Sequence, residues 1–352
     1  MKIKLICISF FLLILNSSYA QLKAGLLSPL EAVYPDINNL KFKNKYISHI
    51  PSNSKAEVLV LIKSDIGNNI SIESNSLNIN EINLDLISAV PVEENTGLDS
   101  RTEQFKGKIN PYVVRRAPFN IYEVIHPLKN NNFTVKNTYS LLRLSVNSNS
   151  LNFNQDYQVV ITLKENNKNR KKLYFKIKVY EATVPTLKNS KFFYTNWFNL
   201  KKMEEKHKLT RWSKSWYIML DKYAKIMAEG RQNCIKIPKE LISLKNNKIH
   251  LDEKKMISFV DVFRKYGFKY YESPHLLGRG KNDDWGSPEL ITNLRSKGYF
   301  SEEGKKEIDT VIRKIKNFTK KYNLTNQWLQ HIADEPTDNN ADCYQQVSKQ
   351  IK

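Results

Sequence analysis

The chain has 352 residues, and its 56 Lys and Arg against 35 Asp and Glu give a formal net charge of +21 at pH 7. This length is enough for two domains with proper hydrophobic cores, and only Cys234 and Cys343 lie beyond the N-terminal segment, which excludes a disulfide-dense scaffold. The lysines are spread over both halves, without an arginine-rich stripe or an aromatic RNA-reading motif. We therefore expect two unlinked thiols and no nucleic-acid partner, with binding of anionic polysaccharide as an alternative role for the lysines.

The N-terminal segment predicts export. Lys2 and Lys4 precede an apolar run at 5–15, which is too short to span a bilayer, and Ser-Tyr-Ala follows at 18–20. No later apolar stretch has spanning length. We expect residues 1–20 to be a cleavable signal peptide, and the rest to be secreted, periplasmic or at the cell surface, without membrane insertion.

Residues 21–182 have the pattern of an all-β domain. Runs rich in β-branched and aromatic residues alternate with Asn, Ser and Lys turns, and no amphipathic helix lies between them. The clearest runs are 56–63, 139–146, 157–163 and 173–180. They predict an antiparallel β-sandwich whose last two strands form a hairpin. A polar loop at 93–108 is expected to be an exposed crossover, or else to lean over a neighbouring site.

After a short linker at 183–190, strands and helices alternate through a second domain at 191–352. The predicted strands are 191–197, 232–238, 268–275 and 327–333, and the predicted helices are 212–229, 253–266, 302–322 and one from about 340. Gly230 is expected in the C′ position that closes the first helix. Such repeats form a parallel sheet, and four of them are the first half of a (β/α)8 TIM barrel.

The apolar run that begins at Trp328 ends on Asp334, Glu335 and Pro336. Proline cannot donate to a sheet ladder, so the two carboxylates should lie where the fourth strand ends. In a barrel this end of the strands is the active-site face. The alternative is an ordinary turn or helix start, where acidic residues before proline are also common.

Four further residues are candidates for sugar binding. Trp197, Asn233 and His275 should lie at or near the C-terminal ends of strands one to three, and Trp285 lies in a long loop on the same side. An indole suits stacking on a sugar, and Asn or His suits hydroxyl recognition; packing is the alternative for each. His331 lies inside its strand and is expected in the core or behind the site. The histidines are scattered without ligand spacing, so no metal and no cofactor is predicted.

Three segments resemble glycoside hydrolase family 123: residues 212–238, 328–336 and 180–185. This family consists of bacterial exported proteins with a β-sandwich followed by a (β/α)8 barrel, some of which are β-N-acetylgalactosaminidases. The resemblance covers almost the whole chain after the signal peptide. The family's barrel continues through four more strands, whereas this sequence stops at Lys352. It therefore looks truncated, and we expect its C-terminal half to aggregate or to be inactive, because the sheet has an open edge.

The resemblance implies a substrate-assisted, retaining glycosidase. Asp334 would orient and stabilise the 2-acetamido group as it attacks the anomeric carbon, and Glu335 would act first as general acid and then as base. Repulsion between neighbouring carboxylates agrees with one protonated acid beside one ionised group. The implied substrate is a glycan with a terminal β-linked N-acetylhexosamine, above all N-acetylgalactosamine. The alternatives are a non-catalytic glycan-binding protein and a surface protein that binds anionic polysaccharide.

Overall fold

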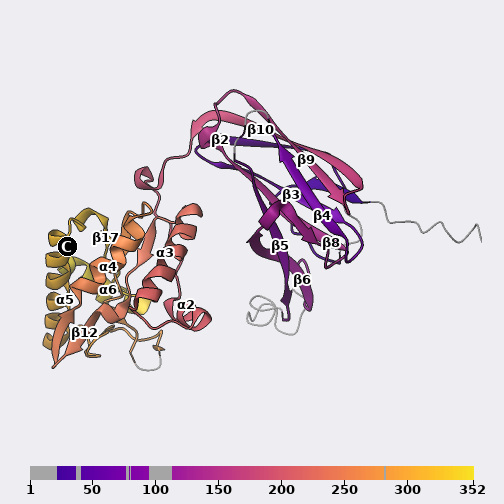
Figure 1. The fold of residues 1–352 in the computed structure, drawn as a ribbon. Coiled ribbons are helices and arrows are strands. Elements are labelled where there is room, and N and C mark those ends of the chain that lie inside the picture. The colour runs from indigo at the N-terminus through magenta and orange to yellow at the C-terminus, as the bar shows by residue number, and fades with distance from the viewer. Residues whose placement is uncertain (1–21, 37–40, 77–78, 80, 95–112, 281–282) are drawn as a thin grey trace, which may run out of the picture. The chain divides into compact units, whose positions relative to one another are not determined.

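A computed structural model describes residues 22–36, 41–76, 79, 81–94, 113–280 and 283–352 (Figure 1). The chain divides into two compact units, unit 1 from Met1 to Val184 and unit 2 from Pro185 to Lys352. The predicted signal peptide at 1–20 and most of the predicted loop at 93–108 lie outside the described residues. None of the described helices is long and apolar enough to cross a membrane.

Unit 1 is a β-sandwich, with two five-stranded sheets in its described residues. The order of the first sheet is β1 (Lys23–Leu27), β3 (Lys55–Lys63), β8 (Tyr139–Asn147), β5 (Asn83–Val92) and β6 (Phe119–Pro127). The order of the second is β2 (Lys45–Ser52), β10 (Asn169–Thr183), β9 (Asp156–Glu165), β4 (Asn69–Asn75) and β7 (Asn132–Thr134). The four clearest predicted runs form β3, β8, β9 and β10, because β-branched and aromatic residues suit a pleated, half-buried backbone.

The pairing of β10 agrees with the prediction on one side only. It forms the expected antiparallel hairpin with β9, with Lys178 opposite Asp156. Its other neighbour, β2, runs parallel to it, with Tyr174 opposite Lys45. The expectation of an antiparallel sandwich is therefore wrong for this pair. β2 and β10 are far apart in the sequence, so no tight turn joins them and imposes the antiparallel direction.

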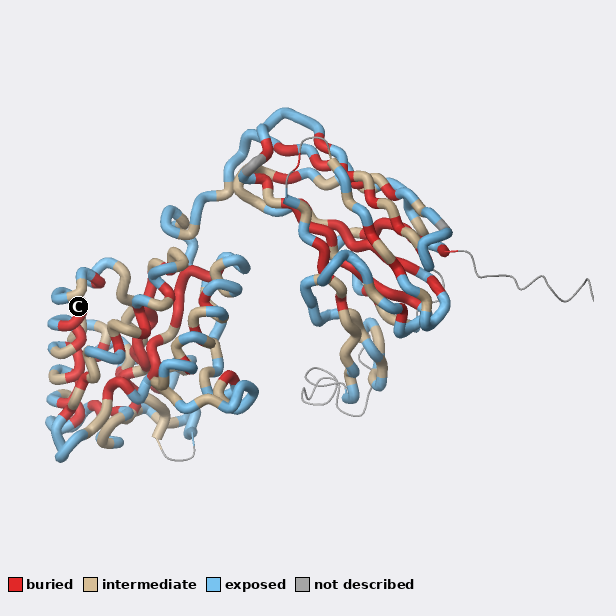
Figure 2. Tube along the Cα trace, viewed as in Figure 1, coloured by how far each residue is buried: buried red, intermediate tan, exposed pale blue. Residues whose placement is uncertain are grey.

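The core of unit 1 lies between the two sheets (Figure 2). Val58, Val60 and Ile62 of β3 are fully buried, and so are Val159 and Ile161 of β9. Successive side chains of a strand point to opposite faces, so this period of two places one face of each sheet in the shared core. Burial of each such side chain contributes about 1.5–3 kcal/mol.

The described residues of unit 2 form a small parallel sheet, helices and two hairpins. Its sheet has the order β11 (Cys234–Lys236), β14 (Tyr270–Glu272) and β17 (Trp328–Leu329). The helices are α2 (Leu200–His207), α3 (Lys214–Glu229), α4 (Glu253–Arg264), α5 (Glu302–Lys321) and α6 (Ala341–Ile351). The hairpins pair β12 (Ile242–Lys245) with β13 (Lys248–Leu251) and β15 (Leu277–Gly278) with β16 (Ile291–Thr292). The hairpins and α2 were not predicted, because their apolar runs are too short to show a period.

The end of α3 differs from the prediction by one residue. Gly230 has φ −76°, and Arg231, with φ 67°, takes the left-handed conformation that the sequence assigns to Gly230. The N–H of Gly230 still bonds to the carbonyl oxygen of Ile226 at 3.0 Å, so Gly230 continues the helical hydrogen bonding. The chain therefore leaves the helix at Arg231.

The predicted strand at 191–197 is not a strand in the structure. The carbonyl oxygen of Tyr194 accepts the N–H groups of Asn233 and Cys234, both at 3.1 Å. The Asn233 side chain then takes the place of a strand ladder: its Oδ1 accepts the N–H of Tyr194 and its Nδ2 donates to the carbonyl oxygen of Phe192, both at 2.8 Å. The described part of unit 2 therefore has three parallel strands, and not the four strands of the predicted half barrel.

Candidate active site

The carboxyl ends of β11, β14 and β17 bring a group of polar side chains together. Lys236 is the last residue of β11, and Glu272 is the last residue of β14. His275 follows β14 closely, and His331 follows β17. Because the three strands are parallel neighbours, their carboxyl ends meet at one edge of the sheet. We call Lys236, Glu272, His275 and His331 the strand-end cluster.

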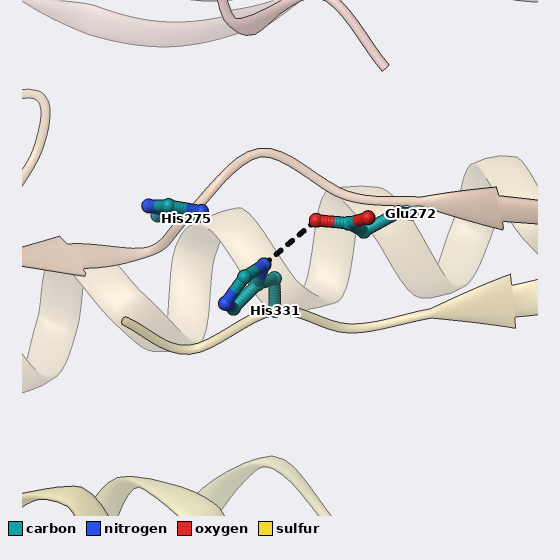
Figure 3. Close-up of side chains that lie close together, drawn as sticks. All are labelled: Glu272, His275 and His331. Atoms are coloured by element: carbon teal, nitrogen blue, oxygen red, sulfur yellow. Dashed lines mark hydrogen bonds and ion pairs between the residues drawn. The ribbon is translucent and has the colours of Figure 1, made fainter. Parts of the chain in front are cut away.

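The strand-end cluster is joined by direct contacts. His331 Nδ1 lies 2.8 Å from Glu272 Oε1, and the rings of His275 and His331 lie 4.0 Å apart between centroids (Figure 3). Lys236 Nζ lies 2.8 Å from His275 Nε2 and 3.8 Å from Glu272 Oε1. An ammonium group can only donate, so Nε2 of His275 is the acceptor in this contact. Two histidines that show no ligand spacing in the sequence therefore lie side by side in the fold.

The electrostatics of the cluster follow from burial and mutual contact. Burial, together with the charges of His331 and Lys236, lowers the pKa of His275 to about 4. Burial also lowers the pKa of Lys236, against the opposing effect of the Glu272 and Asp334 carboxylates. Burial alone would raise the pKa of Glu272, but the hydrogen bond from His331 and the charge of Lys236 outweigh it and lower that pKa. At neutral pH the cluster therefore has an ionised Glu272 and a neutral His275.

Asp334 and Glu335 follow the end of β17 at a distance of several residues. β17 ends at Leu329, so the predicted strand at 327–333 is too long. The backbone of the next residues bonds elsewhere: the N–H of His331 donates to Ser273 Oγ at 2.8 Å, and the carbonyl oxygen of Ile332 accepts the N–H of Leu276 at 2.9 Å. These bonds replace the ladder of a regular strand.

Arg279 holds the backbone of the two carboxylate residues. Asp334 is partly buried, while Glu335 is exposed and has φ 42°, a left-handed conformation that costs a non-glycine residue about 1 kcal/mol or more. Nη1 of Arg279 donates to the carbonyl oxygens of Asp334 and Glu335 at 3.0 and 3.2 Å. Its Nε donates to Asp283 Oδ1 at 2.7 Å. These contacts fix the turn from which both carboxylates project.

Both predicted sugar-stacking indoles have a cation against one face. The Arg279 guanidinium lies 3.7 Å from the centroid of the Trp285 ring, and Lys236 Nζ lies 4.1 Å from that of Trp197. Trp197 remains 59% exposed and Trp285 48% exposed. Stacking of a sugar on either indole is therefore limited to the surface that the cation leaves open.

Asn233, the third predicted sugar-binding residue, supports the backbone in this structure. Asn233 is 1% exposed, and both ends of its side-chain amide bond to the backbone of the segment beside β11, as described above. A side chain in this position satisfies backbone groups and does not present its amide to a ligand. Substrate binding by Asn233 stays a prediction, and what the structure shows for this side chain is the support of the backbone.

An open groove of about 920 Å³ lies along this part of unit 2. Trp197, Lys236 and His275 line it, while Asp334 and Glu335 do not. The groove therefore brings three of the polar and aromatic candidates to one surface, and the predicted catalytic pair lies outside its lining.

Sequence reasoning missed Lys236, Glu272 and Arg279. Lys236 interrupts an apolar run, and Glu272 follows two tyrosines in a predicted strand. A charge in a buried strand is a recognisable sign of a functional or paired group. Arg279 had no such sign, because its partners are backbone carbonyl oxygens in a distant segment.

Comparison with known proteins finds similarity in fold alone. No family model and no curated protein matches the sequence. A solved structure is similar over most of the chain: a family 123 glycoside hydrolase from Clostridium perfringens, described for glycolipid glycan hydrolysis. The TM-score is 0.67 and the identity 10%, and the match covers 94% of this chain and 62% of that one. The fold is thus like that of a family 123 glycoside hydrolase.

Other similar structures match much less well. A sporulation control protein from Bacillus subtilis has a TM-score of 0.21 at 10% identity, covering 46% of this chain and 49% of its own. A xyloglucanase from Bacteroides ovatus has a TM-score of 0.22 at 8% identity, covering 86% of this chain and 59% of its own. TM-scores this low do not indicate a shared fold.

Proposed function

We propose that this protein is an exported glycoside hydrolase that removes a terminal β-linked N-acetylhexosamine, above all N-acetylgalactosamine, from a glycan. The observation behind this proposal is that a fold like that of a family 123 glycoside hydrolase has adjacent carboxylates, Asp334 and Glu335, beyond the end of a parallel strand. Strand-end carboxylates beside neutral and cationic hydrogen-bond donors are suited to acid and base catalysis on a sugar.

In the proposed reaction the substrate supplies the nucleophile. The acetamido oxygen attacks the anomeric carbon, the bond from that carbon to the leaving oxygen breaks, and Glu335 donates the proton that the leaving oxygen takes up. Asp334 orients the acetamido group and stabilises the positive charge that develops on it. A water molecule then attacks the anomeric carbon and gives a proton to Glu335, while the bond from that carbon to the acetamido oxygen breaks. This step restores the acetamido group and the protonated Glu335, and it releases the sugar with its configuration retained.

The side chains around the carboxylates support this division. Arg279 holds the carbonyl oxygens of Asp334 and Glu335, which limits the positions that both side chains reach. Trp197, Lys236 and His275 line the groove, where an indole surface and two polar groups suit a sugar ring and its hydroxyl groups. Glu335 is exposed, so its carboxyl group is accessible for proton exchange with a leaving group and with water.

Leaving-group dependence tests the roles of the two carboxylates. Glu335→Gln should slow substrates with poor leaving groups most, because an activated aryl group needs little protonation to depart. Asp334→Asn should slow all leaving groups similarly, because the acetamide must be oriented whichever group departs. Asp338→Asn, in an exposed acid a few residues away, is the matched control and should change neither series. Equal leaving-group dependence in the two site variants would contradict the assignment.

A glycan-binding protein without hydrolysis is the second candidate. One observation favours it: the groove is lined by Trp197, Lys236 and His275, and not by the two carboxylates. This candidate predicts that a β-N-acetylgalactosaminide binds and is not hydrolysed. It also predicts that binding survives both Asp334→Asn and Glu335→Gln. Turnover that disappears in these variants would exclude it.

A further inference from the structure

Three side chains of the strand-end cluster have the chemistry of metal ligands. Glu272, His275 and His331 each place one ligand atom so that the three atoms lie within 4.8 Å of one another (Figure 3). Two imidazole nitrogens and a carboxylate oxygen are a donor set typical of zinc sites that keep a fourth position open. All three residues are partly buried, and none is an exposed surface acid.

The spacing of these atoms is close to that of a metal site. A tetrahedral zinc ion with bonds of about 2.0–2.1 Å holds its ligand atoms about 3.3 Å apart. His331 Nδ1 and Glu272 Oε1 are 2.8 Å apart, slightly closer than this, and the third atom is within 4.8 Å. Small side-chain rotations would therefore bring all three atoms to the spacing of a bound ion.

The backbone that supports the two histidines is fixed independently of any ion. Ser273 Oγ accepts the N–H of His331 at 2.8 Å and the side-chain amide of Gln330 at 2.7 Å. The carbonyl oxygen of His275 accepts Nδ2 of Asn293 at 2.8 Å. Ligands held on a fixed backbone lose little freedom when a metal binds, which favours affinity.

Lys236 is the group that competes with a metal ion. Its ammonium lies 2.8 Å from His275 Nε2 and 3.8 Å from Glu272 Oε1, so it already supplies a positive charge to two of the three ligands. Lysine has a long, flexible side chain, and this one also lies against Trp197 on the groove wall. The ammonium could therefore move toward the groove and leave the ligands to another cation.

We propose that Glu272, His275 and His331 form a binding site for a divalent metal ion of the zinc type, which competes with the ammonium group of Lys236. The donor set favours zinc, cobalt, nickel or copper over magnesium or calcium, which prefer all-oxygen ligands. The site lies beside the groove, since His275 and Lys236 line it, so an ion reaches it from solvent. This inference does not depend on glycosidase activity.

Calorimetric titration of the full chain with zinc chloride alone tests the site. One zinc ion should bind per chain, and Co²⁺ in its place should give the visible absorption of a low-coordinate histidine site. His331→Ala and His275→Ala should each weaken binding about tenfold or more. His250→Ala, in a histidine of β13 outside the cluster, is the matched control and should bind as the parent does.

Lys236→Met gives the sharper test, because it removes the competing charge and keeps a side chain of similar length. It should bind zinc more tightly than the parent. Without metal, its midpoint of thermal unfolding should differ little from that of the parent. Glu272→Gln keeps the shape of the side chain and should weaken binding. Absence of binding in both the parent and Lys236→Met, or equal affinity in the histidine variants and the control, would overturn the proposal.

Discussion

The two units of this chain keep their backbone in place by different means. In unit 1 the strands are long, up to the 15 residues of β10, and the ladders between them satisfy the backbone. In unit 2 the parallel strands have three, three and two residues, and side chains complete the hydrogen bonding where the strands stop. Ser273 and Arg279 do so at the edge where the candidate site lies. Asn233 does so at the opposite end, just before β11 begins.

This difference teaches where to look for function in such a molecule. A long ladder holds its strands through many similar bonds, so no single side chain decides the backbone path. A short strand depends on particular side chains, and those side chains also position the groups at its end. Substitutions in unit 1 should therefore change stability alone, whereas some substitutions in unit 2 should change activity with little effect on stability.

The largest expected effect separates the two cores. Phe175→Ala in β10 and Phe259→Ala in α4 each remove a buried ring, since these residues are 0% and 1% exposed. Each should lower the unfolding free energy of its own unit by about 3–5 kcal/mol. All five tryptophans lie in unit 2, so tryptophan fluorescence reports unit 2 and circular dichroism in the far ultraviolet reports both. If Phe175→Ala shifted the fluorescence transition as far as Phe259→Ala does, the units would not be independent.

A smaller effect is expected for the turn that contains the two carboxylates. Arg279→Met keeps an apolar stem against Trp285 and loses the hydrogen bonds to the carbonyl oxygens of Asp334 and Glu335. We expect kcat to fall about thirtyfold, with KM nearly unchanged, because each of the two lost hydrogen bonds contributes about 1 kcal/mol. Arg264→Met, which breaks an ion pair with Asp261 on the surface of α4, is the control and should leave kcat unchanged. A change in KM alone would point to a role in substrate binding.

The smallest perturbation uses the two cysteines of unit 2, which are both free and buried among the described residues. Burial and the charge of Glu272 raise the pKa of the Cys234 thiol to about 11, and burial raises that of Cys343. The thiolate is the reactive form of cysteine. A pKa of about 11 makes the thiolate fraction of Cys234 at pH 8 about a hundredfold smaller than that of an ordinary cysteine. Both thiols should react slowly with a thiol reagent until unit 2 unfolds, in step with tryptophan fluorescence. Rapid reaction of the folded protein would show that unit 2 opens locally.

The sequence predicts those elements whose residues give a clear period or a long uniform run. Strands β3, β8, β9 and β10 of the sandwich and helices α3, α4 and α5 are of this kind. The runs at 191–197 and 327–333 also look like strands, and they are irregular because side chains such as Asn233 and Ser273 bond to their backbone. A pattern of apolar residues contains no information about such bonds.

The candidate site is predictable only in part, for the same reason. The two carboxylates stand out because they end an apolar run before Pro336. The contact between His275 and His331 depends on the pairing of β14 with β17, which brings distant segments together. The two histidines are 56 positions apart, so the sequence alone does not predict that contact. The roles of Asp334 and Glu335 remain predictions.

The anomeric form of the first sugar released tests the central claim most directly. Proton magnetic resonance should follow an aryl N-acetyl-β-galactosaminide during hydrolysis by whichever form of this protein is active, alongside the matching plain galactoside. The proposed mechanism predicts that the β-anomer of N-acetylgalactosamine appears first, that Asp334→Asn abolishes its release, and that the plain galactoside is cleaved far more slowly. First release of the α-anomer, or equal rates for the two substrates, would contradict it.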